Sequence, residues 1–247
     1  MRTNDARYAL LERLIDHAPM FPPASLAPAA ALEEDARAAA SPHAFILARL
    51  VWPASALAEA ESTERPISAV LDRPLPADAR VDAVEVPPGA DLAAVPAVAE
   101  IYVEMPLDDR LEERLDGLVE HGLRAKVRCG GTVAPTAEEL GRFVRACRER
   151  GLVFKATAGL HHAVRTSGEH GFLNLLAAAV FEGDEDEVLA ETEVGALALD
   201  ATSLRWRDRS APADELARAR QGLFHSIGSC SFFEPVDELE SLGVLPL

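Results

Sequence analysis

Short apolar runs, separated by turn residues and helical stretches, fill most of the chain from residue 43 onward. Runs of this kind that alternate with helical patterns are typical of parallel β/α units. The pattern therefore predicts an α/β protein with seven visible strands. They are AFILARLVW (44–52), ISAVLD (67–72), VDAVEVP (81–87), EIYVEMP (100–106), RAKVRCGG (124–131), LVFKATAG (152–159) and FHSIGSCSF (224–232).

Residues 124–159 form the clearest β–α–β unit. The run RAKVRC ends in Gly130 and Gly131, and Thr136 and Glu139 then have the spacing of a capping box before AEELGRFVRACRER. Gly151 follows in the position of a helix C-terminal glycine, ahead of the next strand. We expect the two strands to be parallel, with a right-handed crossover.

An eighth strand around residues 197–206 (LALDATSLRW) would close a TIM-type (β/α)8 barrel. The links PLPADAR (74–80) and ADLAAVPAVA (90–99) leave little room for a helix, so the predicted barrel is irregular. A doubly wound open sheet is the alternative fold, but no GxGxxG follows the first strand.

The first 42 residues have a helical pattern. Residues 6–16 place leucine and isoleucine at helical spacing, prolines in MFPPASLAP (20–28) stop that pattern, and an alanine-rich helix is expected over 28–40. We interpret residues 1–42 as an N-terminal helical cap and residues 43–247 as the barrel, together one structural domain.

Charged residues share one face of several predicted strands. Because side chains alternate along a strand, the outer face of a barrel packs on helices and the polar face must be the lumen. We expect five side chains to converge there, near the C-terminal ends of the strands: Glu85, Glu104, Lys126, Arg128 and Lys155.

The chain has only two lysines, and both fall on this face. Lysine is almost never fully buried without a partner. Burial next to another cation lowers the pKa of a lysine, and the neutral amine can then form a Schiff base with a carbonyl. The alternative is a buried charge network that only fills the lumen.

The stretch KVRCGGTVAPTAEELGRFVRACRERGLVFKATAGL resembles the strand 5 to strand 6 segment of deoxyribose-phosphate aldolases, a class I aldolase family. That family has a K-V-I-x-E-T-G strand and an F-x-K-T-S-T-G strand that holds the Schiff-base lysine, and EIYVEMP resembles its E-I-D-x-V strand. The resemblance covers residues 100–160. It implies that Lys155 is the Schiff-base lysine and that Lys126 is the first lysine of the pair.

The chain departs from this family at three points. Tyr102 stands at the family's strand 4 aspartate, and Cys129 stands at the strand 5 glutamate. No lysine follows Lys155, so the second active-site lysine of the family has no counterpart. The Schiff-base scaffold is therefore expected with a different proton relay and a different substrate.

Two loops could complete a site at the same end of the barrel. His161 and His162 follow the Lys155 strand as candidate acid/base groups, with Arg165 as a candidate clamp for an anionic substrate. Gly228, Ser229 and Ser231 precede a predicted helix and could bind an anion, although a simple turn and helix cap fit equally well.

The composition excludes some classes of binding partner. A net charge of −17 and 5% aromatic residues argue against binding nucleic acid or an anionic membrane. Three widely spaced cysteines, and the lack of a signal peptide or an apolar run long enough for a membrane span, favour the cytoplasm. The oligomeric state, including a homo-oligomer, stays open.

These observations predict a lyase of the class I aldolase type that acts on a small anionic carbonyl compound. Lys155 would form the imine, Lys126 would lower its pKa, and Glu104 and a histidine would move protons. Glu85 and Arg128 would contact the substrate. No cofactor and no metal are expected. A metal-dependent lyase or isomerase, with a histidine and the two glutamates as ligands, and a non-catalytic ligand-binding barrel are the alternatives.

Overall fold

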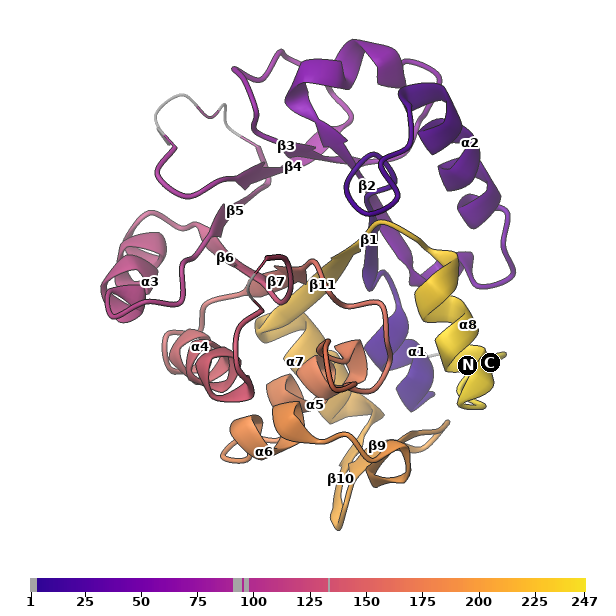
Figure 1. The fold of residues 1–247 in the computed structure, drawn as a ribbon, viewed down its shortest axis with the longest axis vertical. Helices are drawn as coiled ribbons and strands as arrows, with labels where there is room; N and C mark the ends of the chain where they lie inside the picture. The colour runs from indigo at the N-terminus through magenta and orange to yellow at the C-terminus, as the bar shows by residue number, and fades with distance from the viewer. Residues whose placement is uncertain (1–3, 91–94, 96–97, 133) are drawn as a thin grey trace.

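Eight parallel strands close into a barrel, which confirms the predicted TIM-type architecture (Figure 1). The computed structural model describes residues 4–90, 95, 98–132 and 134–247. The order around the barrel is β1-β11-β7-β6-β5-β4-β3-β2, and β2 pairs with β1 to close it. The strands are β1 (Ile15–His17), β2 (Leu47–Pro53), β3 (Ile67–Val70), β4 (Val81–Val86), β5 (Glu100–Glu104), β6 (Arg124–Arg128), β7 (Phe154–Thr157) and β11 (Phe224–Ser229).

Helices surround most of the strand ring (Figure 1). The α-helices are α1 (Ala6–Leu11), α2 (Pro28–Ala39), α3 (Leu111–Glu120), α4 (Ala137–Glu149), α5 (Phe172–Val180), α6 (Glu185–Ala190), α7 (Ala213–Gly222) and α8 (Phe233–Ser241). Short 3-10 helices are η1 (Ala44–Ile46), η2 (Ala54–Ala60) and η4 (Val194–Ala196). Among the described residues, no helix is both long enough and apolar enough to cross a membrane.

The eighth barrel strand is β1, and the prediction that placed it around residues 197–206 is wrong. That segment forms β8 (Leu197–Leu199) and β9 (Ser203–Trp206), which build a separate antiparallel sheet with β10 (Arg209–Pro212). The predicted helix over 6–16 ends at Leu11, and Arg13 then adopts a left-handed φ of 50° that breaks the helix. Two residues later the strand β1 begins, and it is too short to show period-2 alternation.

The barrel therefore begins before residue 43, and residues 1–42 are not a separate cap. β1 pairs in parallel with both β11 and β2, so it belongs to the ring. The helix predicted over 28–40 is present as α2, and it connects β1 to β2. The first β/α unit thus lies inside the segment that the sequence pattern marked as helical.

The barrel is irregular where the sequence predicted connections with little room for a helix. Residues 71–80, which connect β3 to β4, contain no helix. The other link, 90–99, lies largely outside the described residues. On the opposite side, β6, α4 and β7 form the predicted β–α–β unit, and Thr136 and Glu139 make both hydrogen bonds of the capping box.

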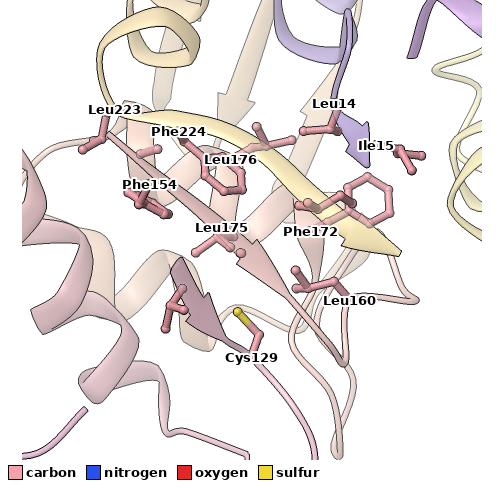
Figure 2. Close-up of a cluster of buried hydrophobic side chains, with 14 of the residues drawn as sticks. Leu14, Ile15, Cys129, Phe154, Leu160, Phe172, Leu175, Leu176, Leu223 and Phe224 are labelled. Carbon is pink, nitrogen blue, oxygen red and sulfur yellow. The ribbon is translucent and has the colours of Figure 1, made fainter. Parts of the chain in front are cut away.

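The outward faces of the strands pack in an apolar layer under the helices (Figure 2). The ring of Phe154 on β7 lies 4.9 Å from the ring of Phe224 on β11 and 5.1 Å from the ring of Phe143 on α4. Leu175 and Leu176 of α5 are buried in the same cluster. Because Phe154 faces outward, its neighbour Lys155 must face the lumen.

Two glycines let the ends of β6 and β7 approach closely at the C-terminal mouth of the barrel. A Cβ at Gly130 would lie 2.7 Å from the Cα of Gly159, and a Cβ at Gly159 would lie 2.8 Å from the Cα of Gly130. Gly159 also has a φ of +63°. Backbone atoms cannot move aside as a flexible side chain can, so this contact requires glycine on both sides.

We predict that Gly130→Ala lowers the free energy of unfolding by roughly 1–3 kcal/mol, because the added methyl group forces two backbones apart. Gly117→Ala in α3 is the matched control, since nothing lies within 4 Å of a Cβ there. This control should be neutral or stabilise by up to about 1 kcal/mol. Urea unfolding measures both variants, and equal midpoints for the two would contradict the close approach.

Candidate active site

The lumen of the barrel is lined by charged side chains at paired register positions on neighbouring strands. Glu104 of β5 is in register with Lys126 of β6, which is in register with Lys155 of β7. Glu85 reaches both lysines from β4. The predicted convergence of these four residues is therefore confirmed.

Lys155 is fully buried between two carboxylates. Its Nζ lies 2.5 Å from Oδ2 of Asp16 and 2.6 Å from Oε1 of Glu85, and its side chain is 0% exposed. The Nζ is also 5.4 Å from the centre of the Tyr102 ring, within range of a cation–π interaction. Asp16, Glu85 and the Tyr102 ring all stabilise the ammonium form.

The expectation that Lys126 lowers the pKa of Lys155 is wrong. Burial does disfavour the ammonium, but the attraction of Asp16 and Glu85 outweighs burial and raises the pKa of Lys155. The two carboxylates contact the amine of Lys155 directly and raise its pKa. This effect is larger than that of the neighbouring Lys126, whose own charge is paired with Glu85 and Glu104. Lys155 is therefore charged at neutral pH.

Glu85 bridges the two lysines. Its Oε1 accepts hydrogen bonds from Lys155 and, at 3.0 Å, from Ser68 Oγ, while its Oε2 lies 3.1 Å from Lys126 Nζ. Burial alone would raise the pKa of this carboxyl, but the attraction of Lys155 and Lys126 lowers it to about 2. Glu85 is thus held as a carboxylate and is a weak base.

Lys126 lies one step closer to solvent than Lys155. Its Nζ is 3.1 Å from Glu85 Oε2 and 3.0 Å from Glu104 Oε2, and its side chain is 7% exposed. Glu104 is more open, with 16% of its side chain exposed. The amine of Lys126 therefore faces one carboxylate fixed by buried cations and one that is partly open to solvent.

A pocket of about 590 Å³ opens above Lys126 at the C-terminal ends of the strands. This is the end at which TIM-type barrels carry their active sites. The loop Phe21–Pro23 and the main chain of Gly159 form part of its wall. Seven of the predicted site residues line it: Glu85, Glu104, Lys126, Arg128, His161, Gly228 and Ser229.

The two histidines are held by α8 and not by the lumen glutamates. Nδ1 of His161 lies 2.9 Å from Glu234 Oε2, and Nδ1 of His162 lies 3.2 Å from Glu238 Oε1. His161 lines the pocket, whereas His162 lines a neighbouring surface hollow. Within the described part of the chain, no group of three or more His, Cys, Asp or Glu side chains is arranged to hold a metal ion.

Arg165 and the serine loop do not form the expected anion site. The guanidinium of Arg165 contacts Nδ1 of His170 at 2.6 Å, and Arg165 is not among the residues that line the pocket. Ser229 Oγ donates to the carbonyl of Ser231 at 2.6 Å, and Ser231 Oγ accepts from the amide of Glu234 at 3.2 Å. The Ser229 hydroxyl closes a turn and the Ser231 hydroxyl binds an amide in the first turn of α8, which agrees with the turn that the sequence left open as the alternative.

Asp16 is the site residue that sequence reasoning missed. It lies on β1, is 0% exposed, and accepts from Lys155, from Ser226 Oγ at 2.7 Å and from the amide of Arg49 at 3.1 Å. An aspartate in the middle of the apolar run LIDHAP was the available signal. The interpretation of residues 1–42 as a cap removed it from the barrel.

A second layer of charges fills the N-terminal half of the lumen. The hydroxyl of Tyr102 lies 2.7 Å from Glu100 Oε2 and 2.9 Å from Nδ1 of His225. Burial and the neighbouring Glu100 carboxylate raise the pKa of Tyr102, so its hydroxyl stays protonated. Tyr102 therefore separates Lys155 from the ion pairs that Glu100 makes with Arg49 and Arg124.

We predict that wild type loses stability as pH falls from about 4.5 to about 2, and that Glu85→Gln loses less over this range. The folded-state pKa of Glu85 lies below its unfolded value, so its contribution is present above the unfolded pKa and is lost as the carboxyl protonates. At pH 7 the variant should be less stable by roughly 3 kcal/mol.

Urea unfolding of both proteins at several pH values measures the difference between them. The contribution of surface carboxylates, which titrate in both proteins, cancels in the difference between the two free energies of unfolding. A difference that stays constant from neutral pH to pH 2 would contradict the ionised, lysine-bound state of Glu85.

The resemblance to class I aldolases rests on residues 100–160 alone. No family model matches the chain, and no curated protein matches it either.

Proposed function

We propose that the protein is an enzyme of the Schiff-base lyase type, which acts on a small anionic carbonyl compound in the pocket at the C-terminal mouth of the barrel. The amine of Lys126, and not that of Lys155, attacks the substrate carbonyl. The observation that carries this proposal is the position of Lys126 Nζ at the base of the pocket, 3.0 Å from Glu104 and 3.1 Å from Glu85.

The two lysines differ in how accessible their amines are to a substrate in the pocket. Lys155 is 0% exposed and its Nζ is clamped by Asp16 and Glu85, so a substrate would have to break two buried ion pairs to reach it. Removing one partner of a buried pair costs roughly 3–5 kcal/mol. Lys126 lines the pocket directly, and one of its two carboxylate partners, Glu104, is partly exposed to solvent.

Glu104 is the group placed to take that proton. The ammonium of Lys126 gives a proton to Glu104, and the nitrogen lone pair forms a bond to the carbonyl carbon while the carbonyl electrons move to oxygen. Glu104 returns the proton to this oxygen. The nitrogen gives a second proton to the hydroxyl, which leaves as water, and the protonated imine that remains keeps the third proton of the original ammonium. This iminium draws electrons from the adjacent carbon–carbon bond.

Lys155 and Glu85 form a fixed pair of buried charges beneath the pocket. Lys155 keeps Glu85 ionised, and Glu85 in turn contacts Lys126. A carboxylate next to the nitrogen favours the positive iminium over the neutral carbonyl. The buried pair thus stabilises the charge that the reaction creates.

Arg128 provides the recognition of an anionic substrate. It follows Lys126 by two residues on β6, so both side chains face the same pocket. In the described structure no carboxylate lies within ion-pair distance of its guanidinium, which leaves its donors available for a carboxylate or phosphate group. A pocket of about 590 Å³ suits a small molecule.

The resemblance to deoxyribose-phosphate aldolases supports the reaction class and not the substrate. Lys126 and Lys155 occupy the two matched lysine positions, but Tyr102 replaces the relay aspartate with a group that stays protonated. The proton relay of that family is therefore absent at this position. Glu104, two residues further along β5, takes over the role in our proposal.

Reductive trapping tests the proposal. The protein is incubated with acetaldehyde, glyceraldehyde, glyoxylate or pyruvate, reduced with borohydride, and mapped by mass spectrometry. We expect an adduct on Lys126 that is absent in Lys126→Arg. In Arg128→Gln, labelling by the two 2-oxo acids should fall about tenfold, because a charge-assisted contact is lost, while labelling by neutral aldehydes stays unchanged.

The two lysines make the outcome unambiguous. An adduct on Lys155 alone would keep imine chemistry and overturn the assignment to Lys126. If neither lysine is labelled by any compound while the amino terminus is, the protein is a ligand-binding barrel or uses other chemistry, and the proposal fails.

A further inference from the structure

A second cavity, of about 510 Å³, lies at the opposite, N-terminal end of the barrel. Residues of α1, β2, α7 and β11 and of the turn after α1 line it. The cavity is separated from the C-terminal pocket by the lumen layer of Asp16, Lys155 and Tyr102. The mechanism proposed above does not use it.

Arg220 places a half-buried guanidinium in the wall of this cavity. Its NH1 donates to the carbonyl of Phe224 at 2.8 Å and to that of His225, and its NH2 donates to the carbonyls of Glu12 at 3.0 Å and Arg13 at 3.3 Å. Its Nε is buried and has no hydrogen-bond partner. Burial lowers the pKa of Arg220 to about 10, so the group is still charged at neutral pH.

Arg13 adds a second cation beside it. The residue has a φ of 50°, a conformation that costs a non-glycine residue on the order of 1 kcal/mol, and its amide donates to the carbonyl of Phe45 at 2.8 Å. Its side chain lines the cavity. The backbone contact between Arg220 and Arg13 keeps the two positive residues adjacent.

These two arginines are unusual in an acidic chain. The net charge is −17, and most described arginines form ion pairs with carboxylates. In the parts of the chain that the structure describes, no carboxylate lies within ion-pair distance of the guanidinium of Arg13 or of Arg220. Arg13 is exposed and Arg220 is half-buried, so a bound anion would supply the counter-charge that neither guanidinium finds in an ion pair.

The two acidic residues of the cavity wall are already engaged. Glu100 forms ion pairs with Arg49 and Arg124, and Glu12 accepts a hydrogen bond from the hydroxyl of Tyr8. Asp16 and Glu12 still attract the guanidinium of Arg220 through space and oppose the lowering of its pKa by burial, but neither carboxylate forms an ion pair with Arg13 or Arg220.

We propose that this cavity binds a small oxyanion, a phosphate or carboxylate group, between Arg13 and Arg220. The site is distinct from the C-terminal pocket and does not depend on the function proposed for it. It is joined to the lumen, because Ser226 and Arg49 line the cavity and both donate hydrogen bonds to Asp16, the partner of Lys155. An anion bound here would lie on the far side of the residues that hold Lys155.

Isothermal titration of the full chain with inorganic phosphate and, separately, with malonate tests the proposal and distinguishes the two anion types. We expect one site per chain for at least one of them. Arg13→Asn should weaken binding about tenfold or more, because it removes charge-assisted donors. Asparagine is chosen because it tolerates a left-handed backbone.

Arg220→Lys is a second variant that keeps the charge but loses the forked donors, and it should also weaken binding. Arg73→Asn is the matched control. Arg73 is exposed, donates to the carbonyl of Ser55 and lies outside the cavity, so this variant should bind as wild type does. Thermal unfolding confirms that each variant is folded.

The variant Arg128→Gln distinguishes anion binding in the N-terminal cavity from anion binding in the C-terminal pocket. Binding that survives in Arg128→Gln and is lost in Arg13→Asn supports the N-terminal site. Binding lost in Arg128→Gln alone would place the anion in the C-terminal pocket and overturn the proposal. Equal weakening in Arg13→Asn and Arg73→Asn, or no binding at millimolar concentrations of either anion, would also overturn it.

Discussion

The ammonium of Lys155 between the carboxylates of Asp16 and Glu85 is the contact on which the lumen of this barrel depends. The three residues come from β7, β1 and β4, and all three side chains are almost completely buried. None of these charges could stay buried alone, because the cost of desolvating an unpaired ion is several kcal/mol. Together they satisfy one another and leave a second glutamate oxygen for Lys126.

This contact also constrains the register of the strands. A shift of one residue on β7 would move Lys155 into the apolar outer layer and bring Phe154 into the lumen. The ion pairs and the aromatic packing therefore specify the same register from opposite faces of the strand. Buried ion pairs contribute little net stability compared with apolar packing, so their main effect here is to select one arrangement and to position Lys126.

Charge is distributed along the lumen in layers. Glu100, Arg49 and Arg124 pair near the N-terminal end, Tyr102 and Lys155 occupy the middle, and Lys126, Glu104 and Arg128 face the C-terminal pocket. Only the end layers meet solvent. Chemistry and ligand exchange are therefore expected at the two mouths, while Lys155 and Tyr102 in the middle layer are closed to solvent.

Periodicity along the chain was enough to predict the strand–helix alternation, the β6–α4–β7 unit and the inward parity of Glu85, Glu104, Lys126 and Lys155. These features are local, because alternation, capping and turn residues act over a few positions. Tertiary pairing decided the rest. β1 has only three residues and gains its strand conformation from β11 and β2. The contact of Asp16 with Lys155, and therefore the direction of the pKa shift at Lys155, could not be predicted from the sequence pattern. A charge that responds to partners 139 and 70 residues away along the chain depends on which strands close the barrel, and no local pattern carries that information.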